Sequence, residues 1–222
     1  MSSVARVFAV TDRFPIAVLV SGNGTNLQAL IDRVHAPADS PVEIVLVVSS
    51  SADAVAVGRA TTAGIRVEIV DRDDFADRES RDRALADLVE AAEPGLVVLA
   101  GWMSILTPWF LDRFPDRVIN LHPSLLPAFP GMHAIDEALA WGVRYTGVTV
   151  HFADAEVDGG PPILQEPVPI SPDDSLEMLR ERVRDVEHRL LSDAVALFAA
   201  GRVHRDPARR RRVLIDDEGV RG

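Results

Sequence analysis

The feature that most constrains the fold is a series of short, uninterrupted Val, Ile and Leu runs that alternate with helix-like stretches. We expect strands at residues 16–21, 42–49, 66–70, 96–100 and 118–121, and helices at 26–34, 52–63 and 78–92. Strands that alternate with helices pair in parallel, and strands apolar on both faces fit a sheet covered on both sides. The chain is therefore predicted to form an α/β fold with a Rossmann-like, mostly parallel sheet, in which ligands bind beyond the carboxyl ends of the strands.

The pattern changes after Gly142. Residues 145–152 and 163–170 are expected to be strands separated by an Asp/Gly/Pro turn, which adds an antiparallel unit to the sheet. A long amphipathic helix, 175–200, follows, with Asp173 or Asp174 as its cap and Gly201 at its end. We found neither a linker nor a repeat, so we expect an N-terminal extension (1–14), a single domain (15–205) and a C-terminal tail (206–222).

Composition excludes several kinds of chemistry. The chain of 222 residues has 47% hydrophobic and 26% charged residues, which is typical of a soluble globular protein. It has no cysteine and no lysine, so thiolate catalysis, disulfides, cysteine-bound metals and a Schiff-base lysine are excluded. No apolar run approaches the roughly 20 residues of a membrane span, and no secretory signal is evident. We therefore expect a cytoplasmic protein that does not act on membranes.

The formal net charge of −11 argues against a nucleic-acid partner, because such binding needs a basic surface. It leaves room for a small anion held by backbone amides. The Arg209–Arg212 run could be a partner patch, but a solvated end of an acidic chain is the interpretation we favour.

A glycine-containing loop, SGNGTN (21–26), joins the first expected strand to the first expected helix. Gly22 and Gly24 permit close backbone approach, and the amides that open the helix are free to meet an anion. The loop is neither a Walker motif nor a dinucleotide fingerprint, since no Lys follows it and residue 27 is Leu. Phosphate binding and a tight turn without a ligand both remain open from the spacing alone.

A second unusual segment is NLHPSLLPAFPG, which begins at Asn120. Asn120 and His122 are separated by one residue, so in an extended strand both side chains project from the same face. An imidazole relays protons near neutral pH, and an amide donates to a developing oxyanion. The prolines that follow stiffen the loop, which favours a catalytic role over the alternative of a structural histidine.

A third segment is the turn 154–161, in which Asp158 precedes two glycines. Asp158 is either only a turn former or, if the turn folds back over the strand that carries His122, a carboxylate that orients this imidazole. His133, His151 and Glu187 have no local explanation. Their spacing contains no helical HExxH pair, so it gives no support for a metal site.

Six segments together resemble the family of phosphoribosylglycinamide formyltransferases, the glycinamide ribonucleotide transformylases of purine biosynthesis. They occur in the family's order across about residues 15–205: SGNGTNLQALID (21–32), LAGWMSIL (99–106), NLHPSLLPAFPGMHA (120–134), GVTVHF (147–152), VDGGPPILQ (157–165) and VEHRLL (186–191). The Asn-x-His-Pro segment and the Asp-Gly-Gly turn are typical of formyltetrahydrofolate-dependent enzymes in general. The first and last segments narrow the resemblance to this family.

The resemblance implies transfer of a formyl group from 10-formyltetrahydrofolate, the co-substrate, to the amine of phosphoribosylglycinamide, with no metal ion required. It assigns catalysis to Asn120, His122 and Asp158. It assigns the ribonucleotide to Gly24, Thr25, Asn26 and Glu187, and the folate to Arg78, Met103, Ser104, Ile105, Leu106 and the loop 154–158. It also allows a homodimer, which nothing in the sequence pattern requires.

The chain departs from the family pattern at two positions. Ser104 stands where members often have Arg, and Ala128 stands where a Lys often follows the Ser-Leu-Leu-Pro motif. Each departure removes a cation that would assist an anionic ligand.

Three other classes of protein share some of these features. A formyltetrahydrofolate hydrolase uses the same three residues on water, but such enzymes usually carry an extra N-terminal domain, and only about 15 residues precede the first expected strand here. Methionyl-tRNA formyltransferase is longer, and the acidic charge of this chain counts against RNA binding. A non-catalytic phosphate binder has no need of Asn120, His122 and Asp158.

Overall fold

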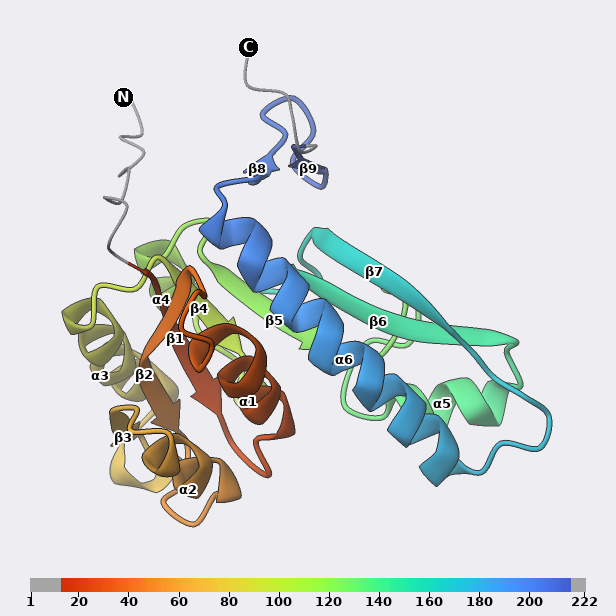
Figure 1. The fold of residues 1–222 in the computed structure, drawn as a ribbon, viewed down its shortest axis with the longest axis horizontal. Helices are drawn as coiled ribbons and strands as arrows, with labels where there is room; N and C mark the ends of the chain where they lie inside the picture. Colours follow the sequence, from red (N-terminus) through yellow and green to blue (C-terminus); the bar gives the residue numbers. More distant parts are fainter. Residues whose placement is uncertain (1–12, 217–222) are drawn as a thin grey trace.

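The computed structural model describes residues 13–216, which form a seven-stranded sheet flanked by helices and a separate two-stranded sheet (Figure 1). The elements follow one another as β1 (Phe14–Val20), α1 (Thr25–Leu30), the π-helix η1 (Ile31–His35), β2 (Val42–Ser49), α2 (Val55–Thr62), β3 (Val67–Ile69), the 3-10 helix η2 (Arg72–Asp74), α3 (Arg78–Ala91), β4 (Leu96–Leu99), α4 (Pro108–Arg113), β5 (Val118–His122), α5 (Ala134–Trp141), β6 (Tyr145–Phe152), β7 (Pro162–Pro169), α6 (Leu176–Ala199), β8 (Val203–Arg205) and β9 (Val213–Ile215).

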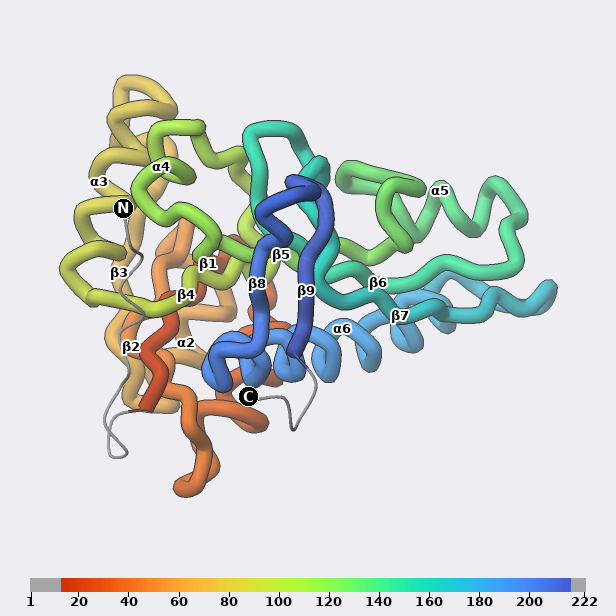
Figure 2. The backbone as a smooth tube through the Cα atoms, turned by 90° about the horizontal axis from the view of Figure 1, so that it is seen from above, coloured from red at the N-terminus to blue at the C-terminus, as the bar shows by residue number. Residues whose placement is uncertain are grey.

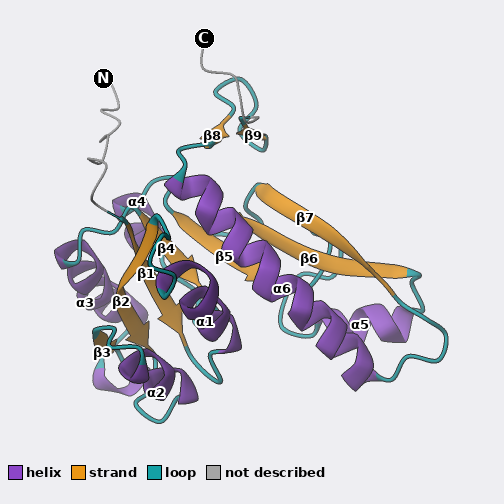
Figure 3. Ribbon diagram, viewed as in Figure 1, coloured by secondary structure: helices purple, strands orange, loops and turns teal. Residues whose placement is uncertain are grey.

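The large sheet has the strand order β3-β2-β1-β4-β5-β6-β7. β1 to β5 run parallel, while β6 and β7 are antiparallel additions at one edge (Figure 3). The chain moves outward from β1 to β3 and then returns to the other side of β1 through β4. This reversal places the carboxyl ends of β1 and β4 next to each other, which is where ligands bind in doubly wound sheets. The predicted fold class is confirmed.

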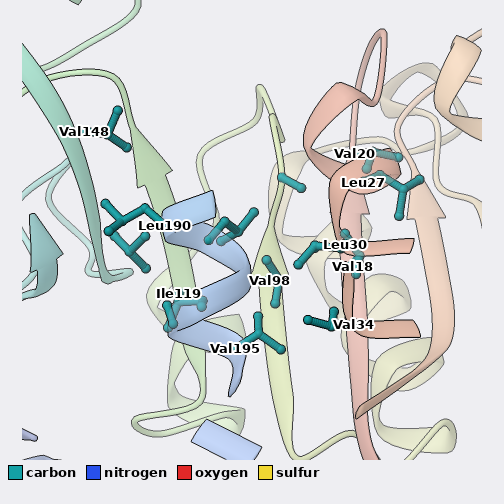
Figure 4. Close-up of a cluster of buried hydrophobic side chains, with 14 of the residues drawn as sticks. Val18, Val20, Leu27, Leu30, Val34, Val98, Ile119, Val148, Leu190 and Val195 are labelled. Atoms are coloured by element: carbon teal, nitrogen blue, oxygen red, sulfur yellow. The ribbon is translucent and has the colours of Figure 1, made fainter. Parts of the chain in front are cut away.

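Two hydrophobic clusters cover the two faces of the sheet. One joins α1, α2 and α6 to the sheet, and the other joins α3 and α4 to the opposite face. Figure 4 shows the α6 side chains Leu190 and Val195 beside Val98 and Ile119 of the sheet. The strands are apolar on both faces because each face is buried beneath helices.

The predicted elements are present with shifted ends. The predicted helix 26–34 is α1 continued by η1, and the predicted helix 52–63 begins later, at Val55. Two short helices, α4 and α5, were not predicted. With six and eight residues, they are too short to establish a clear helical period.

The predicted cap of the long helix was wrong. The hydroxyl of Ser175 accepts from the Met178 N–H, so Ser175 caps α6. Asp174 instead accepts from the Ser171 N–H at 2.8 Å and pairs with Arg182, and hydrogen bonding from this guanidinium lowers the pKa of Asp174 to about 2. The acidic residue therefore fixes the turn before the helix and leaves the cap to its neighbour.

The C-terminal hairpin of β8 and β9 crosses the boundary expected at residue 205. It pairs Val203 with Ile215 and Arg205 with Val213, and Figure 2 shows it running from the end of α6 toward the loop between β6 and β7. Within the Arg209–Arg212 run, Arg211 donates to the Gly159 carbonyl at 2.6 Å, although the run is exposed as expected. The rest of the expected tail, 217–222, and residues 1–12 of the expected extension lie outside the described residues.

Gly24 is the position where the fold depends most clearly on glycine, and it yields a first prediction. Its φ is +67°, and an added Cβ would lie 2.6 Å from the Ala56 Cβ. We expect Gly24→Ala to lower the free energy of unfolding by about 2–3 kcal/mol, from αL strain and overpacking. Urea unfolding measures this loss.

Gly22→Ala is the matched control, because a Cβ there meets no atom within 4 Å. It should stay within about 0.5 kcal/mol of the parent protein. Equal losses for the two variants would contradict the predicted clash of a Gly24 side chain with Ala56.

Candidate active site

A cleft of about 500 Å³ opens at the carboxyl ends of β1, β4 and β5. This volume suits a ligand of moderate size. The walls of the cleft come from the start of α1, the loop after β4, the end of β5, the turn between β6 and β7, and one residue of α6. Its lining includes Asn26, Met103, Ser104, Ile105, Leu106, Asn120, His122, His151, Asp154, Asp158 and Glu187.

Antiparallel pairing of β5 with β6 assembles the polar floor of the cleft. Asn120 lies directly opposite His151, and His122 lies opposite Thr149. Side chains two residues apart on a strand share a face, so all four project to the same side of the sheet. Ile119, which precedes Asn120, and Val150, which lies between Thr149 and His151, belong to the hydrophobic cluster on the other side.

Asp158 completes this cluster from the turn after β6. One carboxylate oxygen, Oδ2, accepts from the Gly131 N–H at 2.8 Å and lies 3.3 Å from His122 Nδ1. The other, Oδ1, lies 3.4 Å from Asn120 Nδ2 and 3.7 Å from His151 Nε2. Asp158 has φ +53°, an unusual conformation for a residue with a side chain, and this aims the carboxylate inward.

The ring of His122 lies between two hydrogen-bond acceptors. Its Nε2 lies 2.8 Å from the Phe129 carbonyl, and its Nδ1 faces the Asp158 carboxylate. Both partners are acceptors only, so an imidazole that donates to both carries two protons. The ring is 4% exposed, and this burial strengthens its attraction to Asp158.

The contacts and burial of His151 favour a neutral ring. Its Nδ1 lies 2.9 Å from the Phe152 carbonyl, which requires a proton on Nδ1, and its Nε2 can then accept from Asn120 Nδ2 at 3.2 Å. Burial lowers the pKa of His151, which also favours the neutral ring. The cleft thus places a histidine on either side of Asp158, and burial favours the neutral form of one of them, His151.

The sequence did not assign a role to His151. Its position directly across from Asn120 follows from the register of β5 against β6, which no local pattern encodes. The only sequence signal was a histidine within an otherwise β-branched strand, GVTVHF.

The Pro-rich loop after His122 is held by a buried hydroxyl. Thr149 Oγ1 donates to the Ser124 carbonyl at 2.7 Å, accepts from the Leu126 N–H at 3.1 Å and accepts from Gln165 Nε2 at 2.9 Å. Thr149 and Ser124 are fully buried. The loop is therefore fixed from β6 and β7, and it holds the Phe129 carbonyl against His122.

The structure separates the predicted folate residues into two groups. Met103, Ser104, Ile105 and Leu106 line the cleft, as does the loop from Asp154 to Asp158 in part. Arg78 does not, because it is exposed in the first turn of α3. No residue of α3 is in the cleft lining, and Arg81 and Asp82, one turn further along, bind the backbone of the loop after β4 instead.

Asn26 and Glu187, two of the four predicted ribonucleotide residues, line the cleft from α1 and α6. Burial raises the pKa of Glu187 to about 7, against hydrogen bonding from Asn26, which lowers it. Asn26 Oδ1 is buried without a hydrogen-bond partner.

Gly24 and Thr25 lie at the N-terminus of α1, just outside this lining. The loop that contains them is held by Arg59 of α2, whose Nε donates to the Asn23 carbonyl at 2.9 Å. Ser21, at the start of the same loop, accepts from the Met103 N–H at 3.0 Å. Ser21 therefore joins the loop after β1 to the loop after β4.

Among residues 13–216, no group of three or more His, Asp and Glu side chains is arranged to hold a metal ion. In the same part of the chain, no helix has both the length and the apolar character needed to cross a bilayer.

A doubly wound sheet with Asn, His and Asp gathered at its strand ends defines a Rossmann-like α/β protein with an acid–base site. The model of the formyl transferase family matches residues 14–195. The chain belongs to this family.

Relatives and solved structures agree with this assignment. The chain is 42% identical to a phosphoribosylglycinamide formyltransferase of Haemophilus influenzae, over 85% of this chain and 88% of the relative. It is 45% identical to the protein of that name from Mycobacterium tuberculosis, over 83% and 84% of the two chains. The crystal structure of glycinamide ribonucleotide transformylase 1 from Symbiobacterium toebii superposes with a TM-score of 0.87 at 42% identity, covering 97% of this chain and all of that one.

The bonds of Thr149 yield a second prediction. We expect Thr149→Val to lower the free energy of unfolding by about 2–3 kcal/mol, because two donors and a carbonyl lose their partner in the interior. Denaturant unfolding at neutral pH measures the loss.

Thr146→Val provides the control on the same strand. Thr146 is also buried, yet its hydroxyl has no hydrogen-bond partner, so its removal should be neutral or stabilising. A similar loss in both variants would show that the hydroxyl of Thr149 does not hold the loop.

Glu187 yields a third prediction, on pH. The pKa of Glu187 is raised from 4.5 to about 7 in the folded protein. Between these values the unfolded carboxyl ionises first, so the parent protein loses stability as pH rises, by roughly 3 kcal/mol at most. Glu187→Gln should match the parent below pH 4.5 and become increasingly more stable than the parent toward pH 8.

Unfolding free energies measured across this pH range test the effect. Glu181→Gln, at an exposed position of α6, is the control. Its unfolding free energy should change with pH in the same way as that of the parent protein. If the unfolding free energy of Glu187→Gln also changed with pH as the parent's does, the raised pKa of Glu187 would be contradicted.

Proposed function

We propose that this protein transfers the formyl group of 10-formyltetrahydrofolate to the primary amine of phosphoribosylglycinamide, giving formylglycinamide ribonucleotide and tetrahydrofolate in purine biosynthesis. The observation that carries the proposal is the cluster of Asn120, His122 and Asp158 on the floor of a cleft, in a chain similar along most of its length to phosphoribosylglycinamide formyltransferases.

We assign the two substrates to different walls of the cleft. We assign the ribonucleotide phosphate to the backbone amides of Gly24, Thr25 and Asn26, and its ribose to Glu187. We assign the folate to the side of Met103–Leu106 and the loop 154–158, where Met103 and Ile105 expose apolar side chains. Asn120, His122 and Asp158 line the same cleft, where the amine and the formyl carbon would meet.

The first chemical step forms a bond between the neutral amine of the ribonucleotide and the formyl carbon. It places a negative charge on the formyl oxygen and a positive charge on the attacking nitrogen. The amide of Asn120 donates to this oxygen, and the imidazolium of His122, sustained by Asp158, adds a second cationic donor. The low exposure of His122 and Asp158 makes this stabilisation stronger than in water.

The second step breaks the bond between the formyl carbon and N10 of the folate. One proton must leave the attacking nitrogen and one must reach N10, so tetrahydrofolate departs as a neutral amine. His122 and Asp158 relay this proton, with water where the distance requires it. Neutral His151 orients Asn120 by accepting from its amide, and it adds no second positive charge beside Asp158.

The proposal includes further features of the protein: its co-substrate, its location and its partners. It uses 10-formyltetrahydrofolate as a co-substrate without a metal ion, because the proposed steps require only charge stabilisation and proton transfer. It acts in the cytoplasm, where the purine precursors occur, and it has no nucleic-acid partner. We also propose a homodimer, on the resemblance alone.

Single-turnover kinetics test the assignment and give a fourth prediction. We expect His122→Ala and Asp158→Asn to slow formyl transfer by about 10²–10⁴-fold, the usual contribution of a general acid–base group. His133→Ala, which alters an exposed histidine outside the cleft lining, should leave the rate unchanged. A parent-like rate in either of the first two variants would contradict the assigned roles.

The same assay distinguishes transfer from hydrolysis. Tetrahydrofolate should form from 10-formyltetrahydrofolate only when phosphoribosylglycinamide is present. Formation at the same rate without the ribonucleotide would identify a hydrolase instead.

A further inference from the structure

A buried ion pair lies on the side of α3 that faces the cleft loop. Arg81 is 4% exposed and Asp82 is completely buried, although both occur on a surface-covering helix. The guanidinium of Arg81 donates through Nε and Nη2 to one oxygen of Asp82, at 2.9 and 2.5 Å. Charged side chains are rarely buried this deeply, so the pair needs an explanation.

Both charges also bind the backbone of the loop that follows β4. Arg81 Nη2 donates to the Ile105 carbonyl at 3.2 Å, and the second oxygen of Asp82 accepts from the Thr107 N–H at 2.6 Å. With the ion pair itself, these bonds close a ring around residues 105–107. The other end of the loop is tied by Ser21 to the loop after β1.

The loop alternates between side chains that anchor it and side chains that it displays. Trp102 and Leu106 are buried in the cluster beneath α3 and α4, whereas Met103 and Ile105 are 61% and 48% exposed at the cleft. The ring fixes the backbone on both sides of Leu106. It therefore determines where Ile105, and through it the apolar edge of the cleft, is held.

Stability alone does not explain the pair. Replacing a buried ion pair by apolar residues of similar volume is often neutral or stabilising, because two charges must be removed from water. What apolar residues cannot do is bind the Ile105 carbonyl and the Thr107 N–H. The ion pair therefore differs from an apolar pair in one respect, which is that it positions the loop.

We propose that Arg81 and Asp82 are positioning residues that preorganise the loop 101–107 for one of the two substrates, the folate, and leave the ribonucleotide site unaffected. The inference rests on the proposed function, because it takes the loop to be the folate side of the cleft. A loop that is ordered before binding spares the ligand the entropic cost of ordering it.

The test compares two dissociation constants measured by calorimetry on the full-length protein, one for tetrahydrofolate and one for phosphoribosylglycinamide. The variant Arg81→Met/Asp82→Leu retains the volume and removes the ring. We expect its Kd for tetrahydrofolate to rise by about tenfold, from the ordering of Met103 and Ile105, and its Kd for phosphoribosylglycinamide to stay within about twofold.

Two further variants make the test specific. Glu79→Gln/Arg83→Gln removes the exposed ion pair of the same helix, and it should change neither constant. Arg81→Lys keeps the charge beside Asp82 but loses the planar fork that reaches both Asp82 and Ile105, so it should weaken tetrahydrofolate binding alone. It serves in place of the double variant if that protein does not fold.

The possible results are distinct. An unchanged Kd for tetrahydrofolate in a folded variant, or an equal weakening of both ligands, would overturn the positioning role. If the parent protein itself does not bind tetrahydrofolate, the proposed function fails, and that failure appears before any variant is measured.

Discussion

The carboxylate of Asp158 is the group on which the rest of the candidate site depends. Its side chain is only 8% exposed, and a charge held so far from water is stable only among partners. Those partners come from separate segments: His122 from the end of β5, the Gly131 N–H from the far end of the Pro-rich loop, and His151 from β6. The position of Asp158 therefore requires β5, β6, the loop and the turn to be in register together.

The two histidines beside this carboxylate differ in their hydrogen-bond partners. His122 lies between the Phe129 carbonyl and the Asp158 carboxylate, while His151 donates to a carbonyl, and burial lowers its pKa. Two imidazolium ions in so small a volume would repel each other and would have one carboxylate to share. The proposed mechanism therefore uses a single positive charge, that of His122 beside Asp158, where the proposed oxyanion forms.

Away from the catalytic residues, buried polar side chains bind the backbone of loops. Thr149 holds the Pro-rich loop, and the Arg81–Asp82 pair holds the loop after β4. Each satisfies backbone groups of an irregular segment that has no regular ladder to satisfy them. The cleft is thus built from loops with little regular structure that are nevertheless fixed in place by the elements behind them.

The amino-acid sequence by itself determined the architecture, because uninterrupted Val/Ile/Leu runs can be buried on both faces only in a parallel sheet between helices. It also identified Asn120, His122 and Asp158 as candidates, since spacing, prolines and the Asp-Gly-Gly turn are local signals. Tertiary structure alone decided which distant residues meet. It excluded Arg78 from the cleft lining, placed His151 opposite Asn120, and brought Asp82 to Thr107, because strand register and the inward face of a helix are set by packing between segments far apart in the chain.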